Sequence, residues 1–245
     1  MSQRPFLLPP DPDAPFPPAE RALRQPDGLL AVGGDLSPAR LLNAYRNGIF
    51  PWYSAGQPIL WWSPDPRTVF RTDGVRLSSR FRRGLHRSDW EVRADTRFAE
   101  VVTACAAAPR RGQHGTWISA DMQAAYTGLH ELGHAHSVEV FAGDHLVGGL
   151  YGVAIGRMFF GESMFSGASG GSKVALAMLA RVLHGWGWPL LDAQLPNPHL
   201  ASLGAQEWPR ARFLAEAVRL VAQPERAGNW EARFGRLPAS LLVAG

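Results

Sequence analysis

Residues that mark secreted or membrane proteins are scarce in this 245-residue chain. A single cysteine, Cys105, leaves no partner for an intrachain disulfide and fits a reducing compartment. No apolar run approaches the roughly 20 residues of a membrane-spanning helix, and the proline-rich start lacks the apolar segment of a signal peptide. With 46% hydrophobic and only 19% charged residues, we expect a folded cytoplasmic protein with no membrane partner.

Lysine is also scarce, because Lys173 is the only one among 25 lysine and arginine residues; the formal net charge is +4. Five arginines lie within residues 76–87, a density that suits contacts with nucleic-acid phosphates. A solvated helix face would give the same pattern, so the cluster alone leaves both interpretations open. Its members are Arg76, Arg80, Arg82, Arg83 and Arg87.

Composition divides the chain near residue 65. Residues 1–65 are rich in proline and glycine and predict one clear helix, which begins after Ser37, has Pro38 in its first turn and ends at Gly48. The turn sequence SPDP at 63–66 marks a boundary. We therefore expect a small N-terminal domain, 1–65, followed by a larger domain, 66–245, in which helical and strand patterns alternate.

The larger domain has the patterns of an α+β fold. Helices are predicted over 121–132 and 171–187, and strands over 136–141, 145–156, 157–166 and 189–195. Irregular backbone is expected at 196–205. The order helix, meander, helix, strand is similar to the mixed sheet with flanking helices of N-acetyltransferases (a GNAT-like fold). Such a likeness of fold does not give a function.

Two short motifs suggest other chemistry. HELGH, 130–134, matches the H-E-x-x-H pattern of zinc peptidases, which requires both histidines on one continuous helix. Gly133 lies between them, where a left-handed glycine would end the helix, so we expect no metal site here. GASGGSKV, 167–174, lacks the G-K-[ST] order of a phosphate-binding loop, although a glycine-rich helix start can still bind an anion.

Three polar side chains interrupt otherwise apolar strands: Glu162, Asp192 and Gln194. Asp192 and Gln194 are two residues apart and should face the same side of their strand. Buried carboxylates are costly unless they are paired or hydrogen-bonded, so a structural network and a catalytic site both explain them. Cys105 lies in an apolar helical run and is expected to be a core residue rather than a nucleophile.

Several stretches in one order resemble a single family, the bacterial leucyl/phenylalanyl-tRNA–protein transferases. They are GLLAVGGDLSPARLLNAYRNGIFPWY, PILWWSPDPR, GTWI, MQAAYTGLHELGHAHSVEV, LVGGLYGVAIGRMFFGESMFS, SKVAL and LLDAQLPNPHLASLGA, within residues 28–206. The resemblance implies an aminoacyltransferase that moves Leu or Phe, with Met as a further candidate, from aminoacyl-tRNA to the N-terminal Arg or Lys of a protein. It implies that the product is marked for degradation (the N-degron pathway) and that no cofactor or metal is required.

The resemblance also implies roles for polar residues. Asp192 and Gln194 are the candidate catalytic pair: Asp192 orients Gln194, the Gln194 carbonyl aligns the incoming amine, and Asp192 or water takes its proton. Glu162 and Asn197 are expected to position the tRNA end or the first residue of the acceptor protein. The arginine cluster would contact the tRNA backbone, because phosphate contacts position a nucleic acid without reading its sequence.

Apolar and aromatic residues are expected to hold the acceptor end of the tRNA. Stacking of the terminal adenine is assigned to Trp52 and Trp117, with Tyr45 and Tyr126 lining the same area. Trp61 and Trp62 are expected to join the two domains. The pocket for the Leu or Phe side chain is expected to be lined by Leu150, Phe159, Met164, Leu183 and Leu191.

Two other enzyme classes stay open at this point. A coenzyme-A acyltransferase of the same fold would bind acetyl-CoA at the 167–172 loop, where the chain departs from the usual pattern of the family. A zinc peptidase would use HELGH. A purely nucleic-acid-binding role would leave Asp192, Gln194 and the apolar pocket unexplained.

Overall fold

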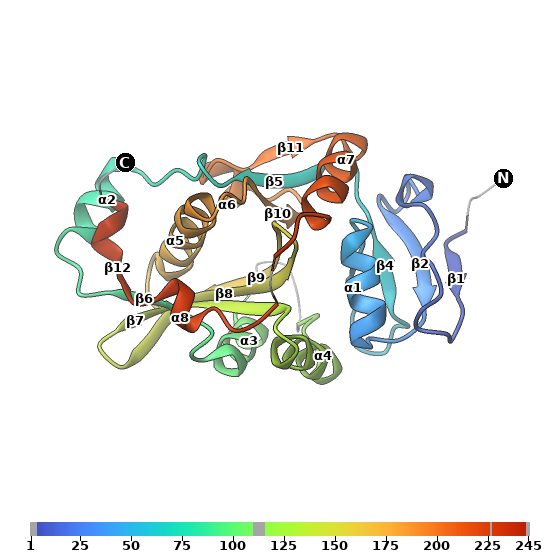
Figure 1. Cartoon of the computed structure of the whole chain (residues 1–245), viewed down its shortest axis with the longest axis horizontal. Helices are drawn as coiled ribbons and strands as arrows, with labels where there is room; N and C mark the ends of the chain where they lie inside the picture. The colour runs from blue at the N-terminus through green and yellow to red at the C-terminus, as the bar shows by residue number, and fades with distance from the viewer. Residues whose placement is uncertain (1–3, 110–115, 226, 244–245) are drawn as a thin grey trace.

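The N-terminal part of the chain is a four-stranded sheet with one helix packed on it (Figure 1). The structure, a computed structural model, describes residues 4–109, 116–225 and 227–243; Gly115 of the GTWI stretch and residues 1–3 lie outside this part. The elements are β1 (Phe6–Leu8), η1 (a 3-10 turn, Ala19–Arg21), β2 (Leu29–Gly33), α1 (Pro38–Arg46), β3 (Phe50–Pro51) and β4 (Leu60–Trp62), and the strand order is β1-β2-β4-β3.

Helix α1 begins and ends as predicted. The Ser37 hydroxyl accepts a hydrogen bond from the backbone N–H of Arg40, Pro38 occupies the first position, and Gly48 has a φ of +68° just after the helix. A serine cap and a proline at the first position both favour helix initiation. Figure 1 shows α1 between the small sheet and the rest of the molecule, so this helix carries the contact between them.

Trp61 and Trp62 hold the small sheet together. The indole N–H of Trp61 donates to the carbonyl of Gly33 at 2.8 Å, and its fully buried ring packs edge-on against Phe16. The N–H of Trp62 donates to the carbonyl of Trp52 at 2.6 Å. Each donor is satisfied inside the N-terminal part, which explains how indoles can be buried there. Trp61 also belongs to the core that continues into the large sheet, so the expectation that Trp61 and Trp62 join the two parts stays a prediction.

The rest of the chain forms an eight-stranded mixed sheet with helices around it (Figure 1). Its strands are β5 (Arg67–Arg71), β6 (Glu91–Ala94), β7 (Ala135–Ala142), β8 (His145–Ile155), β9 (Met158–Ser166), β10 (Leu190–Gln194), β11 (Gln206–Trp208) and β12 (Leu237–Pro238), in the order β11-β5-β10-β9-β8-β7-β6-β12. The helices are α2 (Ser79–Leu85), α3 (Phe98–Ala107), α4 (Ala120–Glu131), α5 (Gly171–Gly185), α6 (Pro198–Ser202), α7 (Arg210–Val221), α8 (Glu231–Phe234) and η2 (Ala239–Leu242).

Most predicted elements of this part are confirmed. The β7–β8–β9 meander lies where the alternating pattern placed it, and β10 is central, parallel to β9 and antiparallel to β5. One prediction is wrong: residues 198–202 are the helix α6, not irregular backbone. Asn197 caps α6 by accepting a hydrogen bond from the N–H of His199, and Pro198 starts it, a cap-plus-proline signal that the sequence carried.

The core has two parts. One fills the space between α5 and the large sheet, whereas the other contains both Leu41 of the N-terminal part and Val69 of the large sheet. Because apolar contacts cross residue 65, the division into domains 1–65 and 66–245 stays a proposal. Cys105 is fully buried in the shared core, as predicted. The α+β class is confirmed, and the likeness to N-acetyltransferases stays a prediction.

Among the residues that the structure describes, no helix is both long and apolar enough to cross a membrane.

Candidate active site

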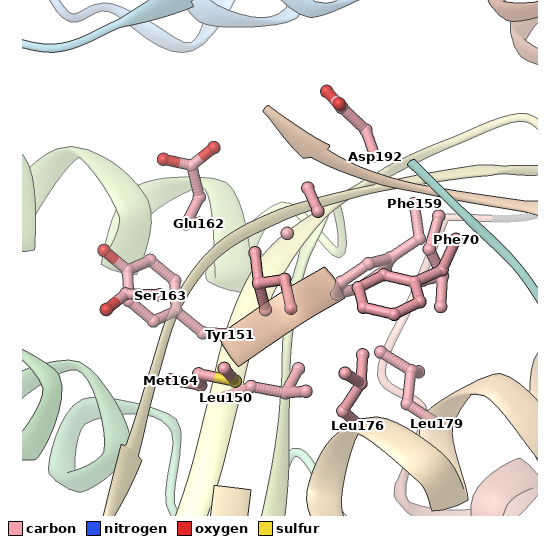
Figure 2. A pocket seen from close by; sticks show the side chains of 14 residues that line it. Phe70, Leu150, Tyr151, Phe159, Glu162, Ser163, Met164, Leu176, Leu179 and Asp192 are labelled. Carbon is pink, nitrogen blue, oxygen red and sulfur yellow. The ribbon is translucent and has the colours of Figure 1, made fainter. Parts of the chain in front are cut away.

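A cavity of about 110 Å³ lies where β8, β9 and β10 meet α5 (Figure 2). Four of the five residues predicted for the side-chain pocket line it, namely Leu150, Phe159, Met164 and Leu191. The fifth, Leu183, is buried in the core on α5 and is not on the wall, which corrects its assignment. The apolar wall also includes residues that the sequence reasoning missed: Phe70, Leu176, Leu179 and Leu200.

The cavity has one polar end. Figure 2 shows the carboxyl groups of Glu162 and Asp192 on the side opposite Leu176 and Leu179 of α5. Glu162 comes from the middle of β9 and Asp192 from β10, the neighbouring strand. An apolar chamber with a few polar groups at one end is a typical small-ligand site. Here the cavity would bury an apolar side chain of the substrate, and the reaction would take place among the polar groups at its rim.

Glu162 is held by three donors from three separate elements. Its Oε1 accepts hydrogen bonds from the Tyr45 hydroxyl of α1 and from the Gln194 side-chain amide of β10, both at 2.7 Å. Its Oε2 is bonded to the Tyr126 hydroxyl of α4, also at 2.7 Å. Burial is the main cause that raises the pKa of Glu162, to about 7, and the charge of Asp192 adds to it; the hydrogen bonds act in the opposite direction.

Tyr45 and Tyr126 are both bonded to this carboxyl group. Both rings are fully buried, so neither offers a face to an adenine here, and the expectation that they line the same area as Trp52 and Trp117 stays a prediction. Their hydroxyls are also bonded to each other at 2.6 Å. Burial first, and the negative charge of Glu162 next, raise the pKa of both phenols well above the usual value, so both keep their protons at neutral pH.

Arg67, which the sequence reasoning missed, pairs with Asp192. Its Nε and Nη2 donate to the two carboxylate oxygens at 2.8 and 2.6 Å, and both side chains are fully buried. The guanidinium lies between the rings of Phe50 and Phe213 and donates through Nη1 to the carbonyl of Gly48. The sequence did carry one signal for this ion pair: Arg67 lies at the start of an apolar strand, where a buried charge without a partner would be costly.

Gln194 has a backbone conformation that strand alternation could not predict. Its φ is +61°, and the pairing of β10 with β5 shifts register between Asp192 and Gln194. The N–H of Gln194 donates to Oδ1 of Asp192 at 3.0 Å, which fixes this turn of the chain. The Gln194 side chain thus reaches Glu162, whereas both carboxylate oxygens of Asp192 are bound by Arg67. Asp192 is therefore placed to position Gln194, and its expected role in taking a proton is not supported.

Two of the other predicted substrate residues are partly open to solvent. Trp52 is half-buried and packs edge-on against Trp62, with ring centroids 5.5 Å apart. Trp117 is half-buried just before α4 and packs against the shared core. Asn197 is exposed, with its Oδ1 engaged in capping α6 at the end of the loop that follows β10.

The two alternative motifs have structural roles. Helix α4 ends before Gly133, whose φ is +76°, so the two histidines of HELGH do not share a helix. His130 stacks on Phe98, and its Nδ1 is 2.8 Å from the carbonyl oxygen of Ala135. Gly171 packs directly on the backbone of Val147, which leaves no room for a Cβ. Close packing explains this glycine without a bound phosphate.

The arginine cluster surrounds α2 at the end of the molecule opposite the small sheet (Figure 1). Four of its side chains are exposed and Arg82 is half-buried. Phe81 of the same helix lies against Gly170, which places α2 beside the start of α5, the helix that lines the cavity. The exposed members are Arg76, Arg80, Arg83 and Arg87.

Comparison with known proteins assigns this arrangement to a family. The family model described as leucyl/phenylalanyl-tRNA protein transferase matches residues 69–218, and the model of its N-terminal domain matches 34–65. The chain belongs to the leucyl/phenylalanyl-tRNA–protein transferase family. It is therefore an aminoacyltransferase enzyme.

Relatives of this enzyme match it over nearly its whole length. The leucyl/phenylalanyl-tRNA–protein transferase of Xanthomonas euvesicatoria is 71% identical over 240 residues, which are 98% of this chain and 96% of the relative. That of Xylella fastidiosa is 63% identical over 99% of this chain and 100% of the relative. A solved structure described as L-PGS from Bacillus licheniformis aligns with 69% of this chain and 53% of that chain, with 10% identity and a TM-score of 0.37, which is too weak a likeness to inform on function.

Proposed function

We propose that the enzyme transfers Leu or Phe from aminoacyl-tRNA to the α-amino group of a protein that begins with Arg or Lys. The observation that carries this proposal is the apolar cavity whose lining includes Glu162 and Asp192 at one end, with Gln194 bonded to Glu162. An apolar aminoacyl side chain fits the chamber, and its ester would then lie at the polar rim, where the amine attacks. The flexible Met164 side chain suits a site that accepts both a branched and a planar group, and Met as well.

The chemistry requires mainly positioning, because the ester of an aminoacyl-tRNA is already activated. Holding the amine next to the ester carbonyl supplies the largest share of the acceleration. The Nε2 of Gln194 is committed to Glu162, so the amide oxygen is the end of this side chain that can align the amine. Asp192 and Arg67 keep Gln194 in its left-handed conformation. The proposed reaction uses no cofactor and no metal.

The tRNA end is proposed to lie across the rim of the cavity. Trp52 and Trp117 are the half-buried aromatic residues assigned to stack on the terminal adenine, at about 1–3 kcal/mol per stacked base. Asn197, at the end of the loop after β10, is assigned to position the acceptor residue or the tRNA end. The α2 arginine cluster would contact the tRNA backbone without reading its sequence.

We place the reaction in the cytoplasm, where aminoacyl-tRNA is made. The added Leu or Phe would become the new first residue of the acceptor protein and mark it for degradation. An acceptor that begins with Arg or Lys carries a second positive charge, which suits a rim that contains carboxylates. The charge of Asp192 is already balanced by Arg67, which leaves Glu162 as the carboxylate that would attract this second charge.

The test is transfer of radiolabelled Leu from leucyl-tRNA to two peptides that differ only in their first residue, Arg or Ala. We expect label on the Arg peptide, unchanged by a chelator, and little on the Ala peptide. An Arg peptide with an acetylated N-terminus is the matched control and should take none. No label on any peptide would refute the proposed function, and equal label on the Arg and Ala peptides would refute the acceptor specificity alone.

A further inference from the structure

Three oxygen-bearing groups form a closed triangle that includes the carboxyl group of Glu162, which lines the cavity. The Tyr45 hydroxyl is 2.7 Å from one carboxyl oxygen of Glu162, the Tyr126 hydroxyl is 2.7 Å from the other, and the two hydroxyls are 2.6 Å apart. All three separations are those of O–H···O hydrogen bonds. Each phenol has one proton to donate, so the two tyrosines supply two protons for three contacts.

The number of protons decides whether the triangle is complete. When Glu162 is ionised, only two protons serve three oxygen–oxygen contacts. The two oxygens of one contact then lie at hydrogen-bond distance with no proton between them. A proton on Glu162 completes the ring, because the carboxyl O–H donates to one tyrosine, that tyrosine to the other, and the second back to the carboxyl group. The geometry therefore has a place for one more proton.

Asp192, the other carboxylate at the rim, is poorly suited to take that proton. Arg67 binds both of its oxygens, and the backbone N–H of Gln194 binds one of them as well. Protonating either oxygen would cost a charge-assisted hydrogen bond. Glu162 makes no ion pair with any described residue, and its bond to Gln194 links it to the residue that would align the amine.

We propose that Glu162, held by Tyr45 and Tyr126, is the group that takes the proton from the acceptor amine; this rests on the proposed function. The α-ammonium group gives one proton to Glu162, and its nitrogen lone pair forms the N–C bond with the ester carbonyl carbon. The C–O bond to the ribose then breaks, and the ribose oxygen takes a second proton from the nitrogen and leaves as a hydroxyl. Glu162 returns its proton to solvent, which balances the reaction.

The surroundings of Glu162 suit a group that exchanges a proton near neutral pH. Burial raises its pKa to about 7, close to the operating pH that favours general-base catalysis. The ionisable groups around it come from every packed element: Tyr45 on α1, Tyr126 on α4, Tyr151 on β8 beside Tyr126, Asp192 on β10 and, paired with Asp192, Arg67 on β5.

Single-turnover transfer from leucyl-tRNA to the Arg peptide, measured from about pH 6 to pH 9, tests this proposal. Glu162→Gln keeps the size of the side chain but cannot take a proton. We expect its rate to be about 10²- to 10⁴-fold lower than wild type near pH 6.5. The loss should shrink above the amine pKa of about 8, because the amine is then already neutral. Asp192→Asn, the comparison variant, keeps the carboxyl group of Glu162 but removes a negative charge that raises its pKa, so its pH–rate midpoint should move to lower pH.

An equal loss for Glu162→Gln at every pH, or no loss, would overturn the role of Glu162 and leave the transferase activity intact. No transfer by the wild-type enzyme would overturn the proposed function and this proposal with it. Should Glu162→Gln fail to fold, Tyr126→Phe is the second variant, because it breaks the ring of three hydrogen bonds and keeps the carboxyl group of Glu162. The midpoint of its pH–rate profile should then move from that of wild type by at least about 0.5 units, and an unmoved midpoint would overturn the proposal.

Discussion

At the scale of single residues, the site depends on partners that are far apart in the sequence. Asp192 is bonded to Arg67 across 125 positions, and Glu162 is bonded to Tyr45 across 117. The polar residues themselves could be predicted, because each interrupts an apolar strand. Their partners could not, since hydrophobic periodicity says which side of a strand is buried but not which distant side chain meets it.

Arg67 offers the sharpest stability prediction at this scale. Arg67→Met removes the guanidinium from between Phe50 and Phe213 and leaves Asp192 buried without its partner. We expect the free energy of unfolding to fall by about 3–5 kcal/mol, as measured by urea denaturation. The double variant Arg67→Met with Asp192→Leu replaces the pair by apolar groups and should recover most of that loss.

The same two variants separate stability from activity. The double variant should remain inactive in Leu transfer, because the N–H of Gln194 no longer has its Asp192 acceptor. A single variant that loses less than about 1 kcal/mol would show that the pair is not an important buried contact. An active double variant would show that Asp192 does not position Gln194.

At the scale of elements, local sequence signals predicted helices and strands well. Ser37, Pro38 and Gly48 set the limits of α1, and Gly133 ends α4 because its φ of +76° suits glycine. The left-handed turn at Gln194 was not predictable, because glutamine rarely adopts a positive φ and the bonds to Asp192 and Glu162 that accompany it here are made across the fold and within the turn itself. Gln194, one of two described non-glycine residues with a positive φ, is therefore also a candidate catalytic residue.

Helix α2 is the element that we expect to give tRNA binding its salt dependence. Changing Arg80, Arg83 and Arg87 to Gln should weaken binding of leucyl-tRNA and lower the slope of log K against log salt by roughly 2 to 3, at about 0.7–0.9 per phosphate contact. Filter binding at several salt concentrations measures this slope.

A control with the same change in charge lies at the other end of the molecule. Arg4, Arg21 and Arg24 are exposed on the N-terminal part, and changing them to Gln should leave the slope nearly unchanged. Equal effects of the two triple variants would mean that net charge, and not the α2 surface, governs tRNA binding.

At the scale of the whole molecule, three parts of the chain meet at one carboxyl group. Glu162 on the large sheet is bonded to Tyr45 of the N-terminal part and to Tyr126 of α4. The small N-terminal part therefore contributes directly to the site, because α1 supplies the Tyr45 hydroxyl and Gly48 supplies a carbonyl that accepts a hydrogen bond from Arg67. Composition predicted the boundary near residue 65 but could not predict that the site would be built across it.

Selection of the transferred amino acid is the most direct test of the cavity as its binding site. One tRNA body is charged in turn with Leu, Phe, Val or Lys, and single-turnover transfer to the Arg peptide is compared. We expect Leu and Phe to react rapidly and Val about 10- to 200-fold more slowly, since it leaves part of the chamber unfilled. Lys should scarcely react, because its charge would be buried against apolar walls. Similar rates for all four would contradict the assignment of the cavity to the aminoacyl side chain.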